Sequence, residues 1–213
     1  MENEIYDSVT KSQETYKKIR NLLLFLSVSA GMAEYYSFFF RGGIFAVLQP
    51  GNIVQIVLCA VNGRKAEIPA FLWPILAFAA GALAAELIRR VYQQFEGMRW
   101  QQTAVLIGAM DIFAVGLLAG EAGKLSDILL AFTWGVLAEV GRRLSVGGEG
   151  RVRLAITAAV AFLVGVLFGH SMINMFGERG IWCCCLFLIV IYYMMAEKKR
   201  AFSPPEKGED LHK

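Results

Sequence analysis

The sequence predicts an all-α fold: a polytopic membrane helix bundle with six crossings, one broken re-entrant segment and an inverted repeat. Three observations lead to this fold class. The 213-residue chain is 56% hydrophobic and 18% charged, with a mean hydropathy of +0.50, and a soluble domain of this size cannot bury so much apolar surface. Its apolar residues fall in seven runs of about the length that spans a bilayer core. Its basic residues are distributed unevenly around those runs.

Composition also excludes other classes of protein. The apolar content is too high for a disordered chain, and a net charge of +3 is too small for a nucleic-acid-binding surface. Three of the four cysteines are contiguous, at 183–185, which does not fit an extracellular disulfide framework. We therefore expect the lipid bilayer as a partner, no nucleic acid, and neither a metal site nor a cofactor.

The apolar runs form one transmembrane domain at residues 21–196, between a polar cytoplasmic N-terminal segment (1–20) and a polar cytoplasmic tail (197–213). We expect both polar segments to be solvated and poorly ordered. Val28-Ser29-Ala30 resembles a signal-peptide cleavage site, but the apolar run continues to Phe40, which favours an uncleaved helix. The seven runs lie at 21–40, 44–61, 70–88, 103–119, 125–140, 154–171 and 181–195.

The second run is interrupted by Pro50 and Gly51 at its centre. An unbroken helix would lose a backbone hydrogen bond at the proline. The sequence thus allows a discontinuous helix or a re-entrant hairpin. If this run does not cross and the N-terminus is cytoplasmic, 14 Lys and Arg residues near the boundaries lie inside and 5 outside; if it crosses, the counts become 8 and 11. The positive-inside rule therefore favours six crossings with both termini cytoplasmic.

Short matches indicate an internal repeat. Ala33-Glu34 recurs 105 residues later as Ala138-Glu139, and each Glu is followed eight residues on by Gly-Gly (42–43 and 147–148). The pattern AFxxGxL at 77–83 recurs 84 residues later at 161–167. The offsets differ by about the length of the broken segment, so the second half (125–196) matches the first (21–119) with that segment deleted. With six crossings the halves would be inverted repeats, as in many secondary transporters; the alternative is chance similarity in an Ala/Gly/Phe-rich sequence.

Three motifs lie in the first half: GMAEYY at 31–36, GIFAVLQPGN at 43–52 and PILAFAAG at 74–81. In these motifs the chain resembles the YoaK family, also called DUF1275, of bacterial multi-pass membrane proteins. The resemblance implies a protein of the bacterial cytoplasmic membrane and implies no reaction or substrate. The chain departs from the family pattern at Pro50, where threonine is usual, and it lacks the second Gly-Asn turn expected after Gly148.

Glu34 and Asp111 are acids within apolar runs that have no basic residue within a helical turn. Because ionisable groups inside a membrane are costly, they indicate function. Burial favours the protonated carboxyl, which would suit proton-coupled transport. The alternative is that each carboxyl hydrogen-bonds to a neighbouring helix and stabilises the bundle.

A second group of pathway or substrate-binding candidates lies at the break: Gln49, Gly51, Asn52 and Gln55. Broken backbone inside a membrane exposes amide and carbonyl groups that coordinate ions or polar solutes in many transporters. The alternative is that these side chains only cap the break.

Glu86 and Glu139 each precede two arginines at i+3 and i+4 spacing, which predicts interfacial ion pairs. Glu139 stays a secondary candidate because the repeat matches it to Glu34. The sequence has no phosphate-binding loop, paired-His metal motif or nucleophilic triad, so we expect no enzyme activity. Two hypotheses follow: a transporter or channel for a small solute or ion, or a non-transporting assembly or regulatory protein. Homo-oligomerisation is left open.

Overall fold

The computed structural model describes residues 2–40, 42–92, 99–118, 123–144 and 150–196. Within these ranges every regular element is helical, which confirms the all-α prediction, and each of the seven apolar runs contains a helix. The helices are α1 (Glu2–Phe40), α2 (Gln49–Val61), α3 (Ile68–Tyr92), α4 (Trp100–Leu117), α5 (Gly123–Leu144), α6 (Gly150–Phe176) and α7 (Trp182–Ala196), with short 3-10 turns η1 (Lys65–Glu67) and η2 (Gly177–Ile181).

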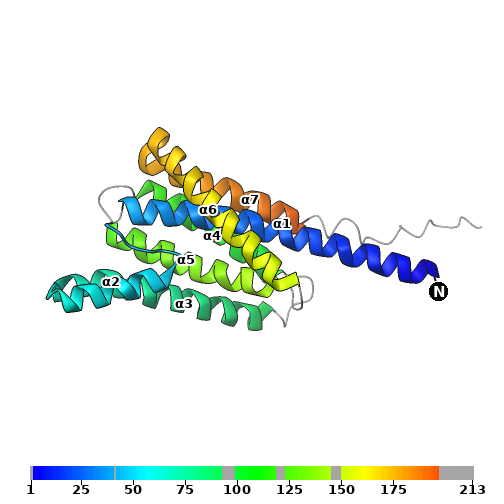
Figure 1. The fold of residues 1–213 in the computed structure, drawn as a ribbon, viewed down its shortest axis with the longest axis horizontal. Helices are drawn as coiled ribbons and strands as arrows, with labels where there is room; N and C mark the ends of the chain where they lie inside the picture. The colour runs from blue at the N-terminus through cyan, green and yellow to red at the C-terminus, as the bar shows by residue number, and fades with distance from the viewer. Residues whose placement is uncertain (1, 41, 93–98, 119–122, 145–149, 197–213) are drawn as a thin grey trace, which may run out of the picture.

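Helix α1 differs from the sequence expectation at its start. It begins at Glu2 rather than near Asn21, so the polar segment continues the first helix and extends beyond the bundle (Figure 1). No glycine or proline occurs before Gly31, and the charged residues of this segment are good helix formers. The tail 197–213 and the Gly147-Gly148 match lie outside the described residues.

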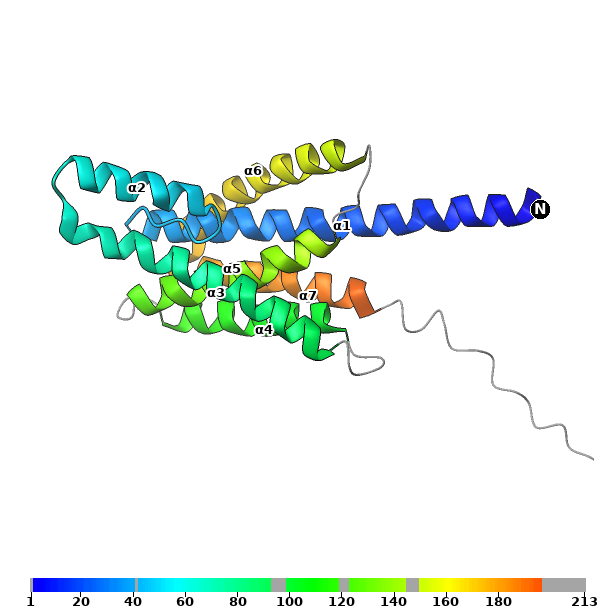
Figure 2. The ribbon, with the colours of Figure 1, turned by 90° about the horizontal axis from the view of Figure 1, so that it is seen from below.

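The helices other than α2 lie along one long axis and alternate in direction: α1, α4 and α6 run one way, and α3, α5 and α7 the other (Figures 1 and 2). At one end, Arg99 before α4 donates to the carbonyl of Met195 on α7, and Arg143 on α5 pairs with Glu86 on α3. We call this the arginine end, and we call the opposite end, where α2 is joined to α3 through η1, the hairpin end.

Helix α2 does not follow this alternation. After α1 ends at the hairpin end, residues 42–48 lead back alongside the bundle, and α2 then returns toward the hairpin end, where α3 begins (Figure 2). A helix of 13 residues is about 20 Å long, which is shorter than a bilayer core of about 30 Å. Pro50 and Gly51 lie in the first turn of α2. Proline is tolerated there because backbone N–H groups in the first turn have no acceptor within the helix, so the N–H that proline lacks is not missed. The break predicted at Pro50 therefore lies just before it, in the loop.

The apolar surface is that of a membrane protein. Four stretches are long and apolar enough to cross a membrane: Gln13–Phe40, Lys65–Tyr92, Trp100–Leu117 and Val152–Ala196, the last of which contains both α6 and α7. Leucines near the middle of outer helices, such as Leu83 and Leu163, are 67% and 62% exposed. Side chains of this type would be solvated by lipid rather than water.

Two helix pairs make backbone contact through glycine. In the α1–α6 pair, a methyl group added at Gly31 would overlap the carbonyl oxygen of Phe162, and one added at Gly165 would overlap the carbonyl of Val28. Such close approach without side chains between the helices is the usual packing of small residues in membranes.

The α3–α5 pair repeats this arrangement. A methyl group at Gly81 would overlap the carbonyl oxygen of Phe132, and one at Gly135 would overlap that of Phe78. The spacing is the same in both pairs. On each helix, the residue whose carbonyl contacts the partner's glycine lies three residues before the glycine of its own helix. The two pairs therefore pack by the same local geometry.

Candidate functional site

Glu34 connects α1 to the start of α2. Its carboxylate accepts hydrogen bonds from the backbone N–H groups of Val47 (2.7 Å) and Leu48 (3.1 Å), and the side chain is buried. Leu48 is the N-cap of α2 and has no side-chain acceptor of its own. A carboxylate from another helix thus accepts from the amides of the N-cap residue and the residue before it, whereas a capping Ser or Asp would accept from amides two or three residues further on. The carboxylate lies at the helix end where a negative charge is favoured.

Ser37 belongs to the same cluster and was not among the residues singled out from the sequence. Its hydroxyl accepts a hydrogen bond from the N–H of Ala46 (3.2 Å) and donates to the carbonyl of Glu34 (3.1 Å), and it is fully buried. The sequence does contain one indication of its role. Ser37 lies three residues after Glu34, which places both side chains on one face of α1. Together these two residues bind three consecutive amides of the loop.

Asn52 fixes the other side of the loop from within α2. Its side-chain oxygen accepts from the N–H of Phe45 (2.9 Å), and its amide nitrogen donates to the carbonyl of Phe45 (2.6 Å) and to Oε1 of Gln49 (2.8 Å). The Gln49 amide in turn donates to the carbonyl of Ala46 (2.9 Å). Asn52 is completely buried, so its amide replaces the backbone partners that Phe45 would have in a regular helix.

Gly51 is required by packing against this loop. A methyl group at Gly51 would come within 2.6 Å of the Phe45 ring. Gln55 is different: it lies one turn further along α2, is partly exposed, and makes no hydrogen bond with the residues that the structure describes. The structure thus brings Glu34, Gln49, Gly51 and Asn52 into one cluster and leaves Gln55 at its edge.

Asp111 lies elsewhere, between α4 and α5. The hydroxyl of Thr133 on α5 donates to its carboxylate at 2.5 Å. Asp111 is partly buried, and Thr133 is buried. This contact matches the alternative interpretation in which the acid bonds to a neighbouring helix, and it places Asp111 outside the cluster around α2.

Glu139 lies at the arginine end within the ion pairs that its spacing predicts. It pairs with Arg142 (2.6 Å) and Arg143 (2.7 Å), and Arg143 also reaches Glu86 on α3 (2.9 Å). Glu86 in turn pairs with Arg89 (2.6 Å). Arginine bonds to both acids therefore tie the ends of the two closely packed helices together.

Chemically, the cluster around α2 supplies a carboxylate, a hydroxyl and two amides to one short stretch of non-helical backbone. These groups can bind and release polar backbone or a small polar solute, and a carboxylate can also exchange a proton. Across the described residues, no three His, Cys, Asp or Glu side chains gather closely enough to hold a metal ion.

Comparison with known proteins identifies a family but no individual relative. No curated protein matches the chain, and no solved structure does. The family described as "protein of unknown function (DUF1275)" matches residues 22–152, which include α1 from Leu22 onward, helices α2 to α5 and the cluster around Glu34 and Asn52. The chain therefore belongs to the DUF1275 family.

Proposed function

We propose that this protein is a proton-coupled transporter or channel for a small solute or ion in the bacterial cytoplasmic membrane. The observation that carries the proposal is the short helix α2, whose start is held within the bundle by the buried acid Glu34. Glu34 lies six residues before the end of α1, which corresponds to a depth of about 9 Å. Non-helical backbone at such a depth is tolerated only where protein or a polar cavity satisfies it.

The proposed topology has six crossings, with α2 re-entrant from outside and both termini cytoplasmic. It is supported by the end of α1 and the start of α3, which lie at the same end of the bundle (Figure 2). It is also supported by the basic residues at the opposite end, including Arg89, Arg99 and Arg143, since cytoplasmic boundaries are rich in Lys and Arg.

The proposed inverted repeat relates α1, α3 and α4 to α5, α6 and α7. Each helix runs opposite to its counterpart (Figure 1), and the packing supports the relation, because α1 contacts α6 as α5 contacts α3. The contact residues keep fixed offsets: Phe78 and Gly81 correspond to Phe162 and Gly165 at 84 residues, and Val28 and Gly31 correspond to Phe132 and Gly135 at 104 residues. Two-fold related halves of this kind are common in secondary transporters.

In the proposed mechanism, residues 42–48 and the start of α2 form an outer gate. A carboxylate accepts hydrogen bonds at both oxygens, whereas a protonated carboxyl presents one O–H donor. When an outer proton binds Glu34, one of the amides of Val47 and Leu48 loses its acceptor and faces a donor. The loop is then released, and loss of the proton restores both bonds and closes it.

Flux in proteoliposomes tests this function. Vesicles containing an internal pH dye would be exposed to Na⁺, K⁺, ammonium and a panel of small amino and carboxylic acids. We expect one of these to drive proton movement in the wild-type protein, and we expect Glu34→Gln to abolish the coupling. The matched control is Glu67→Gln, an exposed acid at the hairpin end. Absence of flux with every probe, or equal flux in wild type and Glu34→Gln, would contradict the proposal.

Cysteine labelling tests the topology independently of transport. Ala66 is exposed between α2 and α3, so Ala66→Cys, with the four native cysteines replaced by alanine, should react with an impermeant maleimide added to intact cells. Reaction only after the cells are opened would rule out both the six-crossing topology and the inverted repeat.

One observation favours a second function, that of a non-transporting assembly or regulatory protein. Both carboxylate oxygens of Glu34 and the side-chain amide of Asn52 are bonded within the chain itself, as they would be in a purely structural cap. Purification in mild detergent would then return a stoichiometric partner together with a protein that gives no flux.

A further inference from the structure

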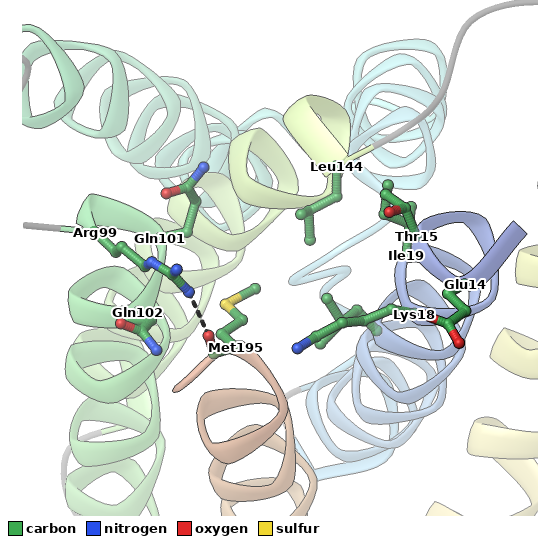
Figure 3. Close-up of a pocket in the computed structure, with 10 residues that line it drawn as sticks. Glu14, Thr15, Lys18, Ile19, Arg99, Gln101, Gln102, Leu144 and Met195 are labelled. Carbon is green, nitrogen blue, oxygen red and sulfur yellow. Dashed lines mark hydrogen bonds between the residues drawn. The ribbon is translucent and has the colours of Figure 1, made fainter. Parts of the chain in front are cut away.

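A cavity of about 470 Å³ lies at the arginine end, away from the α2 cluster. It is bounded by the polar part of α1, the start of α4 and the ends of α5 and α7 (Figure 3). A volume of this size is typical of small-molecule sites. Its wall on α1 includes Lys18, one turn before the apolar run that begins at Leu22, so the cavity lies where membrane and water would meet.

The cavity carries hydrogen-bond donors and positive charge. In Figure 3 the ammonium group of Lys18 extends toward the centre of the cavity, in the direction of Arg99 and Gln102, while the carboxylate of Glu14, which also lines the cavity, lies farther from Arg99 than that ammonium group does. Lys18 makes no hydrogen bond or ion pair with any residue that the structure describes. An ammonium group has three N–H donors, and these remain available for a ligand.

Arg99 also has side-chain hydrogen-bond donors without a partner among the residues that the structure describes. One of its guanidinium nitrogens donates to the carbonyl of Met195 at the end of α7 (2.5 Å), which fixes the side chain beside the cavity. A guanidinium has five N–H donors in a planar fork that suits phosphate and carboxylate oxygens. The bond to Met195 thus holds at the cavity a group whose other side-chain donors have no partner among the residues that the structure describes.

Other residues of the lining are apolar. Leu22 and Met195 are buried, and Ile19 and Leu144 lie beside them. A free inorganic anion would leave this surface uncovered, whereas a ligand with an apolar body would cover it. The cavity therefore combines charged groups with apolar ones close beside them, and Met195 lies between Arg99 and Lys18 (Figure 3).

We infer that this cavity binds an anionic phosphate ester, with the phosphate bound by Lys18 and Arg99 and the apolar part of the ligand against Leu22 and Met195. Two sources share this chemistry, an anionic phospholipid of the inner leaflet and a soluble phosphate ester. Juxtamembrane Lys and Arg attract anionic lipid headgroups by about fivefold in affinity per charge. The inference does not depend on transport.

Native mass spectrometry of the full-length protein, stripped of lipid in detergent, tests the site with defined probes. Phosphatidylglycerol, phosphatidylcholine and glycerol 3-phosphate would be titrated separately. We expect either phosphatidylglycerol or glycerol 3-phosphate to bind at least fivefold more tightly than phosphatidylcholine, about the contribution of one charge. Displacement of bound phosphatidylglycerol by glycerol 3-phosphate would assign the soluble source, and retention would assign the lipid.

Two variants separate this cavity from general surface charge. Lys18→Gln should weaken binding of the favoured probe by about fivefold or more. Lys17→Gln removes the exposed lysine next in sequence, which does not line the cavity, and this variant should bind the probe as the wild type does. Equal binding of all three probes, or equal effects of the two variants, would overturn the inference. Unfolding temperatures of both variants in detergent would show whether a loss of binding reflects a loss of folding.

Discussion

Replacing Asn52 by leucine is expected to release the loop before α2 while α2 itself stays folded. Leucine has the same number and branching of side-chain heavy atoms as asparagine, although it is larger, and it cannot replace the bonds to the backbone N–H and carbonyl of Phe45. Because Asn52 is completely buried, water does not replace them in the closed loop. An unsatisfied buried group costs about 1–3 kcal/mol, so the two groups together destabilise the closed loop by about 2–6 kcal/mol.

Hydrogen exchange measures this change directly. At about tenfold per 1.4 kcal/mol, exchange of the amides in residues 42–48 should accelerate by at least about 30-fold in Asn52→Leu, in protein reconstituted into nanodiscs. Gln55→Leu, one turn further along the same helix at a partly exposed position, should leave exchange unchanged. If the two variants behave alike, the asparagine does not hold the loop and the cluster described around Glu34 is incorrect.

Two further predictions concern the packing of the long helices. Gly135→Ala should lower the unfolding free energy in mixed micelles by about 1–3 kcal/mol through overpacking, because the added methyl group overlaps the backbone carbonyl of Phe78. Gly108→Ala should cost less, because its methyl group would have as nearest neighbours side-chain carbons of Thr133 and Leu137, at 3.3 to 3.5 Å. Equal costs would argue against the close α3–α5 contact. The Asp111–Thr133 hydrogen bond should give a coupling energy of about 0.6–1.7 kcal/mol, typical of polar pairs in membrane helices. The measurement is a double-mutant cycle on the unfolding free energies of Asp111→Ala and Thr133→Val, each of which removes the bond. A coupling of zero would mean that the bond contributes nothing to stability.

The helices themselves could be predicted from the sequence because each apolar run is long, and only their ends differ. The sequence predicts the fifth run at 125–140, whereas α5 extends over Gly123–Leu144. The helix is longer than its apolar part because Lys124, Arg142 and Arg143 can continue the helix while their charged groups reach water. Hydropathy predicts the part of a helix that lies in lipid. The helix continues as far as its backbone hydrogen bonds do, so its observed bounds are wider.

The candidate site could be predicted residue by residue but not as a unit. Glu34 and Asn52 stood out for separate reasons, an acid in an apolar run and a polar residue after a proline. The contact of both residues with one loop depends on the non-helical path of residues 42–48. The hydrophobic periodicities of helices (3.6 residues) and strands (2 residues) give no information about such a path. Ser37 was missed because a lone serine in a membrane helix is common, and only the position of the loop gives it a partner.

The two related acids of the proposed repeat illustrate how one constraint can be met in two ways. Glu34 is satisfied by loop amides that a re-entrant segment supplies. Glu139 matches Glu34 at the 105-residue offset of the sequence motif, one residue more than the 104-residue offset of the helix contacts. It is also buried and is satisfied by Arg142 and Arg143 from the next turn of its own helix. A buried carboxylate cannot stay charged without donors, so a half that keeps the acid and lacks the segment must provide cations instead. In the proposed mechanism, that exchange replaces a site that opens with a fixed ion pair, and only the half with the re-entrant segment has a gate.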